Sequence, residues 1–261
     1  MPERGISDEL IRAVRERYEN RLLETVKRYP LPEHVGVIMD GNRRFAKEMK
    51  LTANDGHYLG KKKLEEFLEW CFEIGIRIVT VYAFSTENFQ RDKEEVEFLM
   101  SLYEESFNDL IKDKRVNEKK IRVRLIGKTE LLPPRVLEAA RKAEEHTKNY
   151  NNYFLNVAIA YGGREEIIDA IKKVASDVRD GKITVEQIDH DLFKKYLYTG
   201  ELKDPDLIIR TSGEERISNF LLWQSAYSEL YFMDIYWPEM TKLDLLKAIR
   251  SFQERERRFG R

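Results

Sequence analysis

The sequence predicts an α/β protein in which a six-stranded, mainly parallel sheet is flanked by helices on both faces. Six short apolar runs suited to strands alternate with longer stretches that carry apolar residues at helical spacing. The run at residues 78–84 is almost continuously apolar, which is typical of a strand buried on both faces. The chain has 261 residues, 42% of them hydrophobic, which is enough for one large core.

The elements follow in order along the chain. A first helix is predicted at residues 7–28, with Ser7 as its N-cap, and Pro30 and Pro32 start an extended segment after it. Strands are predicted at residues 35–39, 76–84, 121–126, 154–160, 207–210 and 230–236. Further helices are predicted at residues 60–74, 94–112, 134–148, 164–178 and 243–258. We therefore expect a helical extension at residues 1–32 and one α/β domain at residues 33–261.

Composition excludes several classes of function. Lys and Arg total 46 and Asp and Glu total 47, so the chain lacks the excess positive charge expected of a nucleic-acid-binding protein. Cys71 is the single cysteine, which excludes an intramolecular disulfide and a CxxC metal site. An apolar run long enough for a membrane span and the apolar core of a signal peptide are both absent, so we expect a cytoplasmic protein.

The segment after the first predicted strand suits a phosphorylated ligand. In parallel sheets ligands bind beyond the carboxyl ends of the strands. Asp40, Gly41 and Asn42 follow the first strand and precede a helical segment, whose free N–H groups suit a diphosphate. Asp40 would add a carboxylate for Mg²⁺. An ordinary Asx turn explains this stretch as well.

Two further strand ends carry polar groups. After the second strand stand Ser85, Asn88 and Arg91; a helix N-cap would account for the serine but not for the other two together. After the fifth strand, Arg210 and Arg216 lie among hydroxyl side chains, and arginine forks match phosphate oxygens. A solvated loop is the alternative there.

Motifs for other chemistries are absent from the sequence. It contains no GxxxxGK[ST] phosphate loop, no GxGxxG after a strand, no HExxH zinc motif and no GxSxG nucleophile elbow. The residues alone therefore predict a magnesium-assisted enzyme or binder that acts on phosphorylated ligands.

Longer motifs resemble the undecaprenyl diphosphate synthases of the cis-prenyltransferase family. The resemblance runs from about residue 33 to the C-terminus. Its motifs are HVGVIMDGN from His34, YAFSTEN from Tyr82, IRTSGE from Ile209, RISNFLLWQ from Arg216, SELYF from Ser228 and ERRFG from Glu256. It implies a homodimer that uses Mg²⁺ to condense isopentenyl diphosphate onto an allylic diphosphate. It also implies an apolar tunnel for the growing prenyl chain, and a product that partitions into the membrane.

The resemblance also assigns roles to residues. Asp40 and Asn88 match the catalytic positions, and Asp40 and Glu229 match the metal positions, the latter acting across the dimer. The substrate-binding positions are Gly41, Asn42, Arg43, Arg44, Phe45, His57, Ser85, Thr86, Glu87, Phe89, Arg91, Arg210, Arg216, Ile217, Ser218, Arg258 and Gly260. Of these, Arg258 and Gly260 would reach into the partner subunit's site.

The sequence departs from the family pattern at three positions. Arg43 and Ala53 stand where many relatives have glycine and arginine, and Glu215 stands where a histidine is frequent. These changes and the N-terminal helix favour the archaeal branch, which would use geranylgeranyl diphosphate instead of farnesyl diphosphate as primer. A non-catalytic subunit of the same fold and a phosphate-binding α/β module are the alternatives. An all-helical trans-prenyltransferase is disfavoured because its DDxxD motifs are absent.

Overall fold

A computed structural model describes residues 3–200 and 202–255, with only the backbone described for residues 3–10. Its sheet contains β1 (His34–Ile38), β2 (Ile78–Ser85), β3 (Ile121–Ile126), β4 (Tyr153–Tyr161), β5 (Leu207–Arg210) and β6 (Glu229–Phe232). The strands lie in the order β3-β4-β2-β1-β5-β6, and every neighbouring pair is parallel. The predicted six-stranded α/β fold is confirmed.

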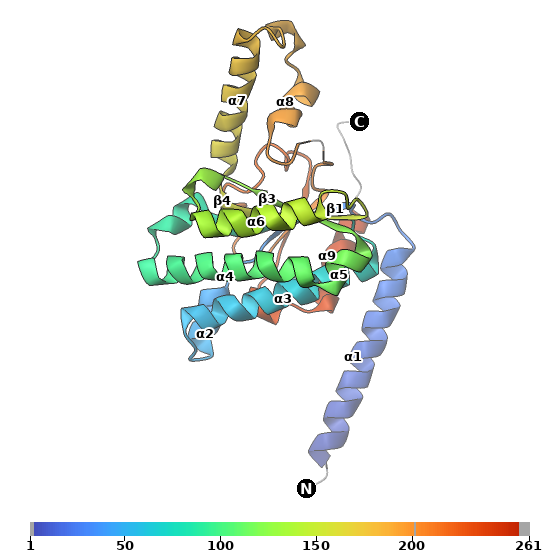
Figure 1. The fold of residues 1–261 in the computed structure, drawn as a ribbon. Coiled ribbons are helices and arrows are strands. Elements are labelled where there is room, and N and C mark those ends of the chain that lie inside the picture. The colour runs from blue at the N-terminus through green and yellow to red at the C-terminus, as the bar shows by residue number, and fades with distance from the viewer. Residues whose placement is uncertain (1–2, 201, 256–261) are drawn as a thin grey trace.

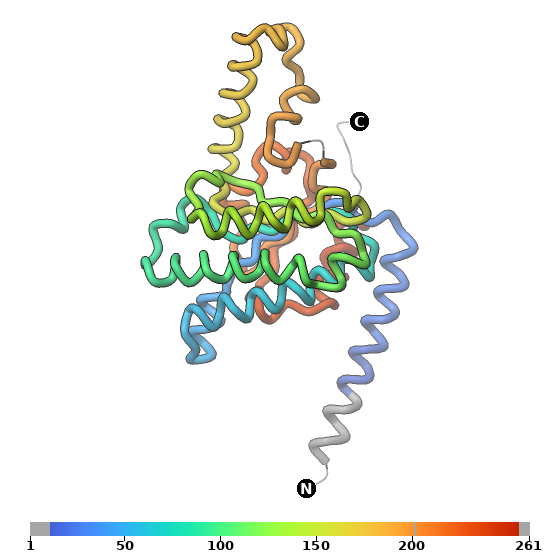
Figure 2. The backbone as a smooth tube through the Cα atoms, in the orientation of Figure 1, coloured from blue at the N-terminus to red at the C-terminus, as the bar shows by residue number. Residues whose placement is uncertain are grey.

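The helices surround this sheet and extend beyond it (Figure 1). They are α1 (Glu3–Lys27), α2 (Asn42–Glu48), α3 (Ala53–Ile74), α4 (Lys93–Lys112), α5 (Lys114–Lys119), α6 (Pro134–Thr147), α7 (Gly163–Arg179), α8 (His190–Tyr196) and α9 (Lys242–Glu254). Helices α3, α4 and α6 lie side by side, whereas α9 packs against β5 and α1. Figure 2 shows α7 and α8 projecting from one end of the molecule and α1 from the other.

Several boundaries differ from the predicted ones. Helix α1 already begins at Glu3, so Ser7 lies inside it and is not its N-cap. Helix α3 starts seven residues earlier than predicted, because Thr52 and Asp55 form a capping box there. Helix α9 ends at Glu254, short of the predicted end at residue 258. Helices α2, α5 and α8 have only six or seven residues each, too few to show a period in the sequence.

Close packing fixes α2 against α3 beside the end of β1. A Cβ atom on Gly56 would lie 2.4 Å from the carbonyl oxygen of Asn42, and one on Gly60 would lie 2.6 Å from the Asn42 side-chain oxygen. Only glycine allows this approach. The two helices therefore hold the segment after β1 in a fixed place at the carboxyl edge of the sheet.

No helix in the described ranges combines the length and apolar character needed to cross a bilayer.

A buried polar network at the opposite edge of the sheet makes stability depend on pH. His34 is fully buried on β1; its Nε2 lies 2.7 Å from the Thr80 hydroxyl and its Nδ1 lies 2.6 Å from the carbonyl oxygen of Lys203. Burial lowers the pKa of His34 from 6.5 to about 4. The unfolded chain therefore binds more protons than the folded one between these two values.

We expect the free energy of unfolding to fall by about 3 kcal/mol as the pH falls from 6.5 to 4, because a shift of one unit is worth about 1.4 kcal/mol. Urea unfolding at several pH values, with His34→Asn as the comparison, measures this contribution. If the variant shows the same pH slope as the wild type, the account of His34 is wrong.

Candidate active site

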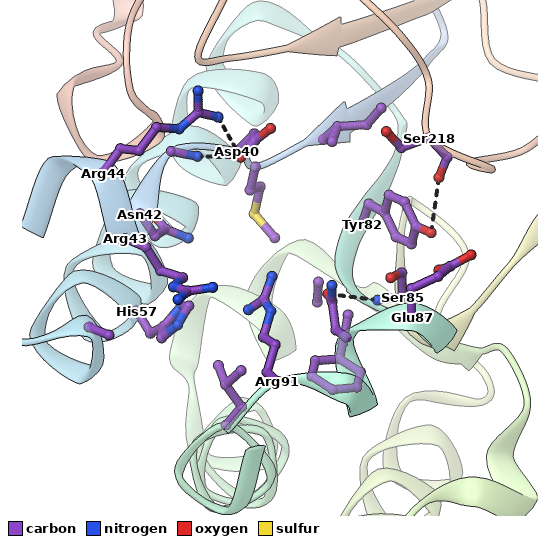
Figure 3. Close-up of a pocket in the computed structure, with 18 of the residues that line it drawn as sticks. Asp40, Asn42, Arg43, Arg44, His57, Tyr82, Ser85, Glu87, Arg91 and Ser218 are labelled. Carbon is purple, nitrogen blue, oxygen red and sulfur yellow. Dashed lines mark hydrogen bonds and ion pairs between the residues drawn. The ribbon is translucent and has the colours of Figure 1, made fainter. Parts of the chain in front are cut away.

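A deep cleft opens at the carboxyl edge of the sheet, beyond the ends of β1, β2 and β5 (Figure 3). Its volume is about 1060 Å³. The segment after β1 and the start of α2 form one wall, and the segment after β2 forms another. The cleft therefore lies where parallel sheets bind ligands.

Asp40 lies on the first wall between two arginines. Its Oδ2 accepts a hydrogen bond of 2.8 Å from Arg210 Nη2, and its Oδ1 accepts one of 3.2 Å from Arg44 Nη2. Burial raises the pKa of Asp40, but the hydrogen bond and charge of Arg210, with the charge of Arg44, outweigh it and hold that pKa below its usual value. Thr211 fixes the Asp40 backbone, since its hydroxyl accepts from the Asp40 N–H at 3.0 Å and donates to the Asp40 carbonyl at 2.7 Å. Asp40 is thus an ionised, rigidly held carboxylate at neutral pH.

The donor set around Asp40 fits a magnesium ion shared with a ligand. In the described part of the chain, no three His, Cys, Asp or Glu side chains are grouped to hold a metal by themselves. Mg²⁺ is commonly held by one or two carboxylates together with substrate phosphate oxygens and water. Three polar atoms beside Asp40 (Asn42 Oδ1, Arg210 Nε and Ser212 Oγ) are buried and lack a hydrogen-bond partner among the described residues. Buried polar atoms without a partner are rare, and a bound water molecule or ion is one explanation for them.

Two further arginine side chains surround Glu95, which lies at the start of α4. The Glu95 Oε1 lies 2.9 Å from His57 Nε2 and accepts from Arg91 Nη1 at 3.1 Å, while its Oε2 lies 3.7 Å from Arg43 Nε. Figure 3 shows Arg43, Arg91 and His57 together on one side of the cleft. Burial lowers the pKa of His57, opposed only in part by Glu95, so its ring is neutral at pH 7. Glu95 therefore holds Arg43 of α2 and Arg91 of the segment after β2 together at one wall of the cleft.

Arg210 connects Asp40 to the loop after β5. Its side chain is buried, and its Nη1 donates to the Ser218 hydroxyl at 2.7 Å and to the Arg216 carbonyl at 2.5 Å. The Arg216 side chain is exposed and pairs with Glu214. The Arg210 guanidinium thus lies at the centre of the site and Arg216 at its rim.

Most of the residues predicted for the site meet in this cleft. Those that line it are Asp40, Gly41, Asn42, Arg43, Arg44, His57, Ser85, Glu87, Asn88, Arg91, Arg210 and Ser218. The others predicted for the two walls and the loop, Phe45, Thr86, Phe89, Arg216 and Ile217, do not line it directly. Phe89, for example, packs its ring against Phe84 with the centroids 4.8 Å apart. Arg258 and Gly260 lie outside the described residues.

Glu229 does not join this cleft within one chain. It begins β6, where it pairs in register with Leu207 at the start of β5, whereas Arg210 at the end of β5 pairs with Phe232. Glu229 therefore lies at the opposite edge of the sheet from Asp40. Its carboxylate accepts from Arg255 Nη1 at 2.5 Å.

Three residues that shape the site were not predicted. Glu95 looks like an ordinary acidic residue in the first turn of a helix, and Thr211 looks like a loop residue. Tyr82 lies in a buried strand run, yet it lines the cleft and its hydroxyl donates to the Ser218 carbonyl at 3.3 Å. Arg91 and Glu95 stand four residues apart on the chain, a spacing typical of ion pairs on helices. This spacing was the sign in the sequence that could have predicted their contact.

An apolar cavity of about 160 Å³ adjoins the cleft between α3, α4 and the sheet. The two spaces share Met39, Asn42, His57, Ala83 and Leu99. The cavity wall also includes Leu64 and Leu68 of α3 and Leu102, Tyr103, Phe107 and Leu110 of α4. The polar cleft and the mainly apolar cavity thus adjoin each other and share part of their lining.

Comparison with known proteins identifies the family. A family model described as putative undecaprenyl diphosphate synthase matches residues 38–260. The chain belongs to the undecaprenyl diphosphate synthase family. A synthase of this family from Pyrococcus abyssi, named tritrans,polycis-undecaprenyl-diphosphate synthase (geranylgeranyl-diphosphate specific), is 62% identical over 94% of this chain and 92% of its own. A protein of the same name from Thermoplasma volcanium is 58% identical over 98% of this chain and all of its own.

Two solved structures share the family fold. The lavandulyl diphosphate synthase from Lavandula x intermedia, in complex with dimethylallyl diphosphate, has a TM-score of 0.84 and 36% identity, covering 88% of this chain and 99% of its own. A probable undecaprenyl diphosphate synthase from Campylobacter jejuni has a TM-score of 0.72 and 33% identity, covering 89% and 99%. Arg43 and Ala53, two of the positions at which the sequence is expected to depart from the family pattern, both line the cleft.

Proposed function

We propose that this protein is a cis-prenyltransferase that adds isopentenyl diphosphate repeatedly to geranylgeranyl diphosphate. The product would be a long-chain polyprenyl diphosphate, the precursor of a glycosyl carrier lipid. One observation carries the proposal: an ionised Asp40 between two arginines lies in a cleft that adjoins an apolar cavity and shares five lining residues with it. This arrangement suits a substrate with a diphosphate head and a hydrocarbon tail. The names of the archaeal relatives support the geranylgeranyl primer.

The first wall would hold the allylic diphosphate. The N–H groups in the first turn of α2, from Asn42 to Arg44, are free to donate to phosphate oxygens, as at other helix N-termini. Arg43 lines the same wall. Its side chain lies near Arg91, because both arginines form ion pairs with Glu95. We propose that Arg43 supplies the positive charge that relatives place at the position of Ala53. Phe45 would act from behind this wall, because it lies on α2 without lining the cleft.

The second wall and the loop after β5 would hold isopentenyl diphosphate. Arg210 and Ser218 line the cleft, and the exposed Arg216 at its rim can close on a bound diphosphate. Asn88 lies across from them, with its Oδ1 accepting from the Ser85 N–H at 3.1 Å. An amide takes up no proton near neutral pH, so we propose that Asn88 orients the substrate where its proton is lost.

We propose the following reaction for this site. The allylic C–O bond ionises and leaves a diphosphate and a delocalised cation. The double bond of isopentenyl diphosphate attacks this cation and forms the new C–C bond. The cation that results loses a proton to a diphosphate oxygen, which sets a new cis double bond. The backbone N–H groups after β1 and the arginines stabilise the charge that develops on the leaving diphosphate. Mg²⁺, held by Asp40 and the diphosphate, would neutralise further negative charge when bound.

The growing chain would occupy the apolar cavity beside α4. On this helix the cavity is lined by Leu99, Tyr103, Phe107 and Leu110, whereas Val96 and Met100 do not line it. Leu102 lines the cavity as well. Each condensation adds five carbons, and each CH₂-sized group buried is worth about 0.8 kcal/mol. We therefore propose that this cavity is the start of the product tunnel.

Filling the cavity should shorten the product. Leu102→Trp places a larger side chain in the wall, so we expect the mean chain length to fall by at least one five-carbon unit. Mass spectrometry of the products measures this. Leu131→Trp is the matched control, because Leu131 is 48% exposed and away from the cavity. An unchanged length distribution in Leu102→Trp would place the chain elsewhere.

We also propose that the enzyme is a homodimer. Ile168 and Ile171 lie three residues apart on α7 and are about half exposed, at 51% and 49%, and Val185 beyond them is 64% exposed. A second copy covering this apolar face would account for it. In this proposal, Glu229 would hold a metal together with residues of the second copy. Arg258 and Gly260 would likewise reach into the active site of that copy.

We propose that the enzyme works in the cytoplasm, at the membrane periphery, where its lipid product would enter the membrane.

Incubation with labelled isopentenyl diphosphate and Mg²⁺ tests the proposal. Geranylgeranyl, farnesyl and geranyl diphosphate serve as primers, and extraction of labelled lipid measures transfer. We expect geranylgeranyl diphosphate to be used best, and chelation of the metal to abolish transfer. If no primer is extended, the chain is a non-catalytic subunit or a binding module.

A further inference from the structure

The loop after β5 is held in a strained conformation where it meets Arg210. Ser218, Asn219 and Leu221 have positive φ angles of 45°, 65° and 45°. Such angles cost a non-glycine residue about 1–2 kcal/mol each, and they persist only where surrounding contacts impose them. The loop supplies the Ser218 hydroxyl that accepts from Arg210. Its conformation therefore determines the shape of this end of the cleft.

Contacts from β2, β4 and α7 hold the loop. The Tyr161 hydroxyl, at the end of β4, accepts from the Leu221 N–H at 3.2 Å. The Gly163 N–H donates to the Asn219 carbonyl at 2.7 Å. The Tyr82 hydroxyl donates to the Ser218 carbonyl, as Figure 3 shows. The bond from Leu221 is the deepest of these, because Tyr161 and Leu221 are both fully buried.

Glu166 on α7 fixes the Tyr161 hydroxyl in turn. Its side chain is 1% exposed, and its Oε2 accepts from the Tyr161 hydroxyl. Its Oε1 accepts from Gln224 Nε2 at 3.0 Å and from the Tyr198 N–H at 2.7 Å. Because the Tyr161 proton points to Glu166, the hydroxyl oxygen can accept from Leu221. A buried carboxylate costs several kcal/mol in desolvation, and removing a hydrogen-bonded one disturbs every donor around it.

We propose that Glu166, acting through Tyr161, is a positioning residue for the isopentenyl diphosphate end of the cleft. It would keep the strained loop in the conformation that presents Ser218 and Arg210 to a diphosphate. Glu166 and Tyr161 do not line the cleft themselves, so they would act without touching the substrate. This inference rests on the proposed function and adds a residue to it.

The test compares two variants that break this link in different ways. Tyr161→Phe removes only the hydroxyl between Leu221 and Glu166, and Glu166→Gln removes the charge. Each is expected to raise the KM for isopentenyl diphosphate by about tenfold, equal to about 1.4 kcal/mol, while the KM for geranylgeranyl diphosphate changes less than about twofold. Steady-state kinetics with each substrate varied in turn measures both values.

Tyr198→Phe is the matched control. It removes a hydroxyl that donates to Asp169 at 2.5 Å and leaves the backbone bond from Tyr198 to Glu166 intact. Both KM values should stay at the wild-type level. If Tyr161→Phe keeps its KM for isopentenyl diphosphate, or raises both KM values equally, the positioning role is refuted. Failure of the wild type to incorporate isopentenyl diphosphate would instead refute the proposed function.

Discussion

Replacing Asp40 by alanine is expected to lower kcat/KM by about a thousandfold, equal to about 4 kcal/mol of transition-state stabilisation. The carboxylate accepts from Arg210 and Arg44, and in the proposed function it would share Mg²⁺ with a diphosphate on this wall. Its loss would remove the proposed metal ligand, and it leaves the buried Arg210 without its anionic partner. Steady-state kinetics at saturating Mg²⁺ measures the effect.

Glu214→Ala is the control for Asp40→Ala. Glu214 accepts from the same Arg44, at 3.0 Å, but does not line the cleft. Exposed pairs of this kind contribute little, so its removal should change kcat/KM by less than about threefold. A loss below about tenfold in Asp40→Ala, or equal losses in the two variants, would contradict the role of Asp40.

The Gly41→Ala substitution is expected to lower kcat/KM by about a hundredfold. Gly41 has a φ of 102°, and a Cβ atom there would lie 2.7 Å from Tyr236 Cδ1 and 2.9 Å from the Ser212 hydroxyl. The backbone on either side of it carries the Asp40 carboxylate and the start of α2. A displacement of about 1 Å at such a position costs about a hundredfold in rate, because the reacting groups lose their alignment.

Gly181→Ala separates this effect from simple backbone strain. Gly181 also has a positive φ, of 70°, but a Cβ atom there would meet nothing within 4 Å. We expect it to lower stability by about 1 kcal/mol and to leave kcat/KM unchanged. Thermal unfolding and kinetics of both variants make the comparison. Wild-type kinetics in Gly41→Ala would show that the segment after β1 tolerates movement.

The sequence was sufficient to predict the sheet because its inner strands are largely buried on both faces. Every residue of β1 is buried, as its run of apolar side chains indicated. The segments carrying Asp40, Asn88 and Arg210 could be found for a related reason: in a parallel sheet each lies just after a buried run, and all three runs end at one edge.

Other features depend on the three-dimensional structure and left no local pattern. Glu95 and Glu166 are acidic residues in the first turns of helices, where such residues usually face water, yet both are buried among hydrogen-bond donors. The place of Glu229 follows from the register between β5 and β6, which no single segment reveals. Helix α3 begins earlier than its apolar periodicity predicts, because a capping box at Thr52 sets its start.

The stereochemistry of the product tests the central claim most directly. The protein would be incubated with geranylgeranyl diphosphate, isopentenyl diphosphate and Mg²⁺, and the methyl resonances of the purified polyprenyl product would be read by carbon NMR. We predict that every unit added to the primer carries a cis double bond, while the primer's own units stay trans. Added units with trans double bonds, or the absence of any extended product, would contradict the account.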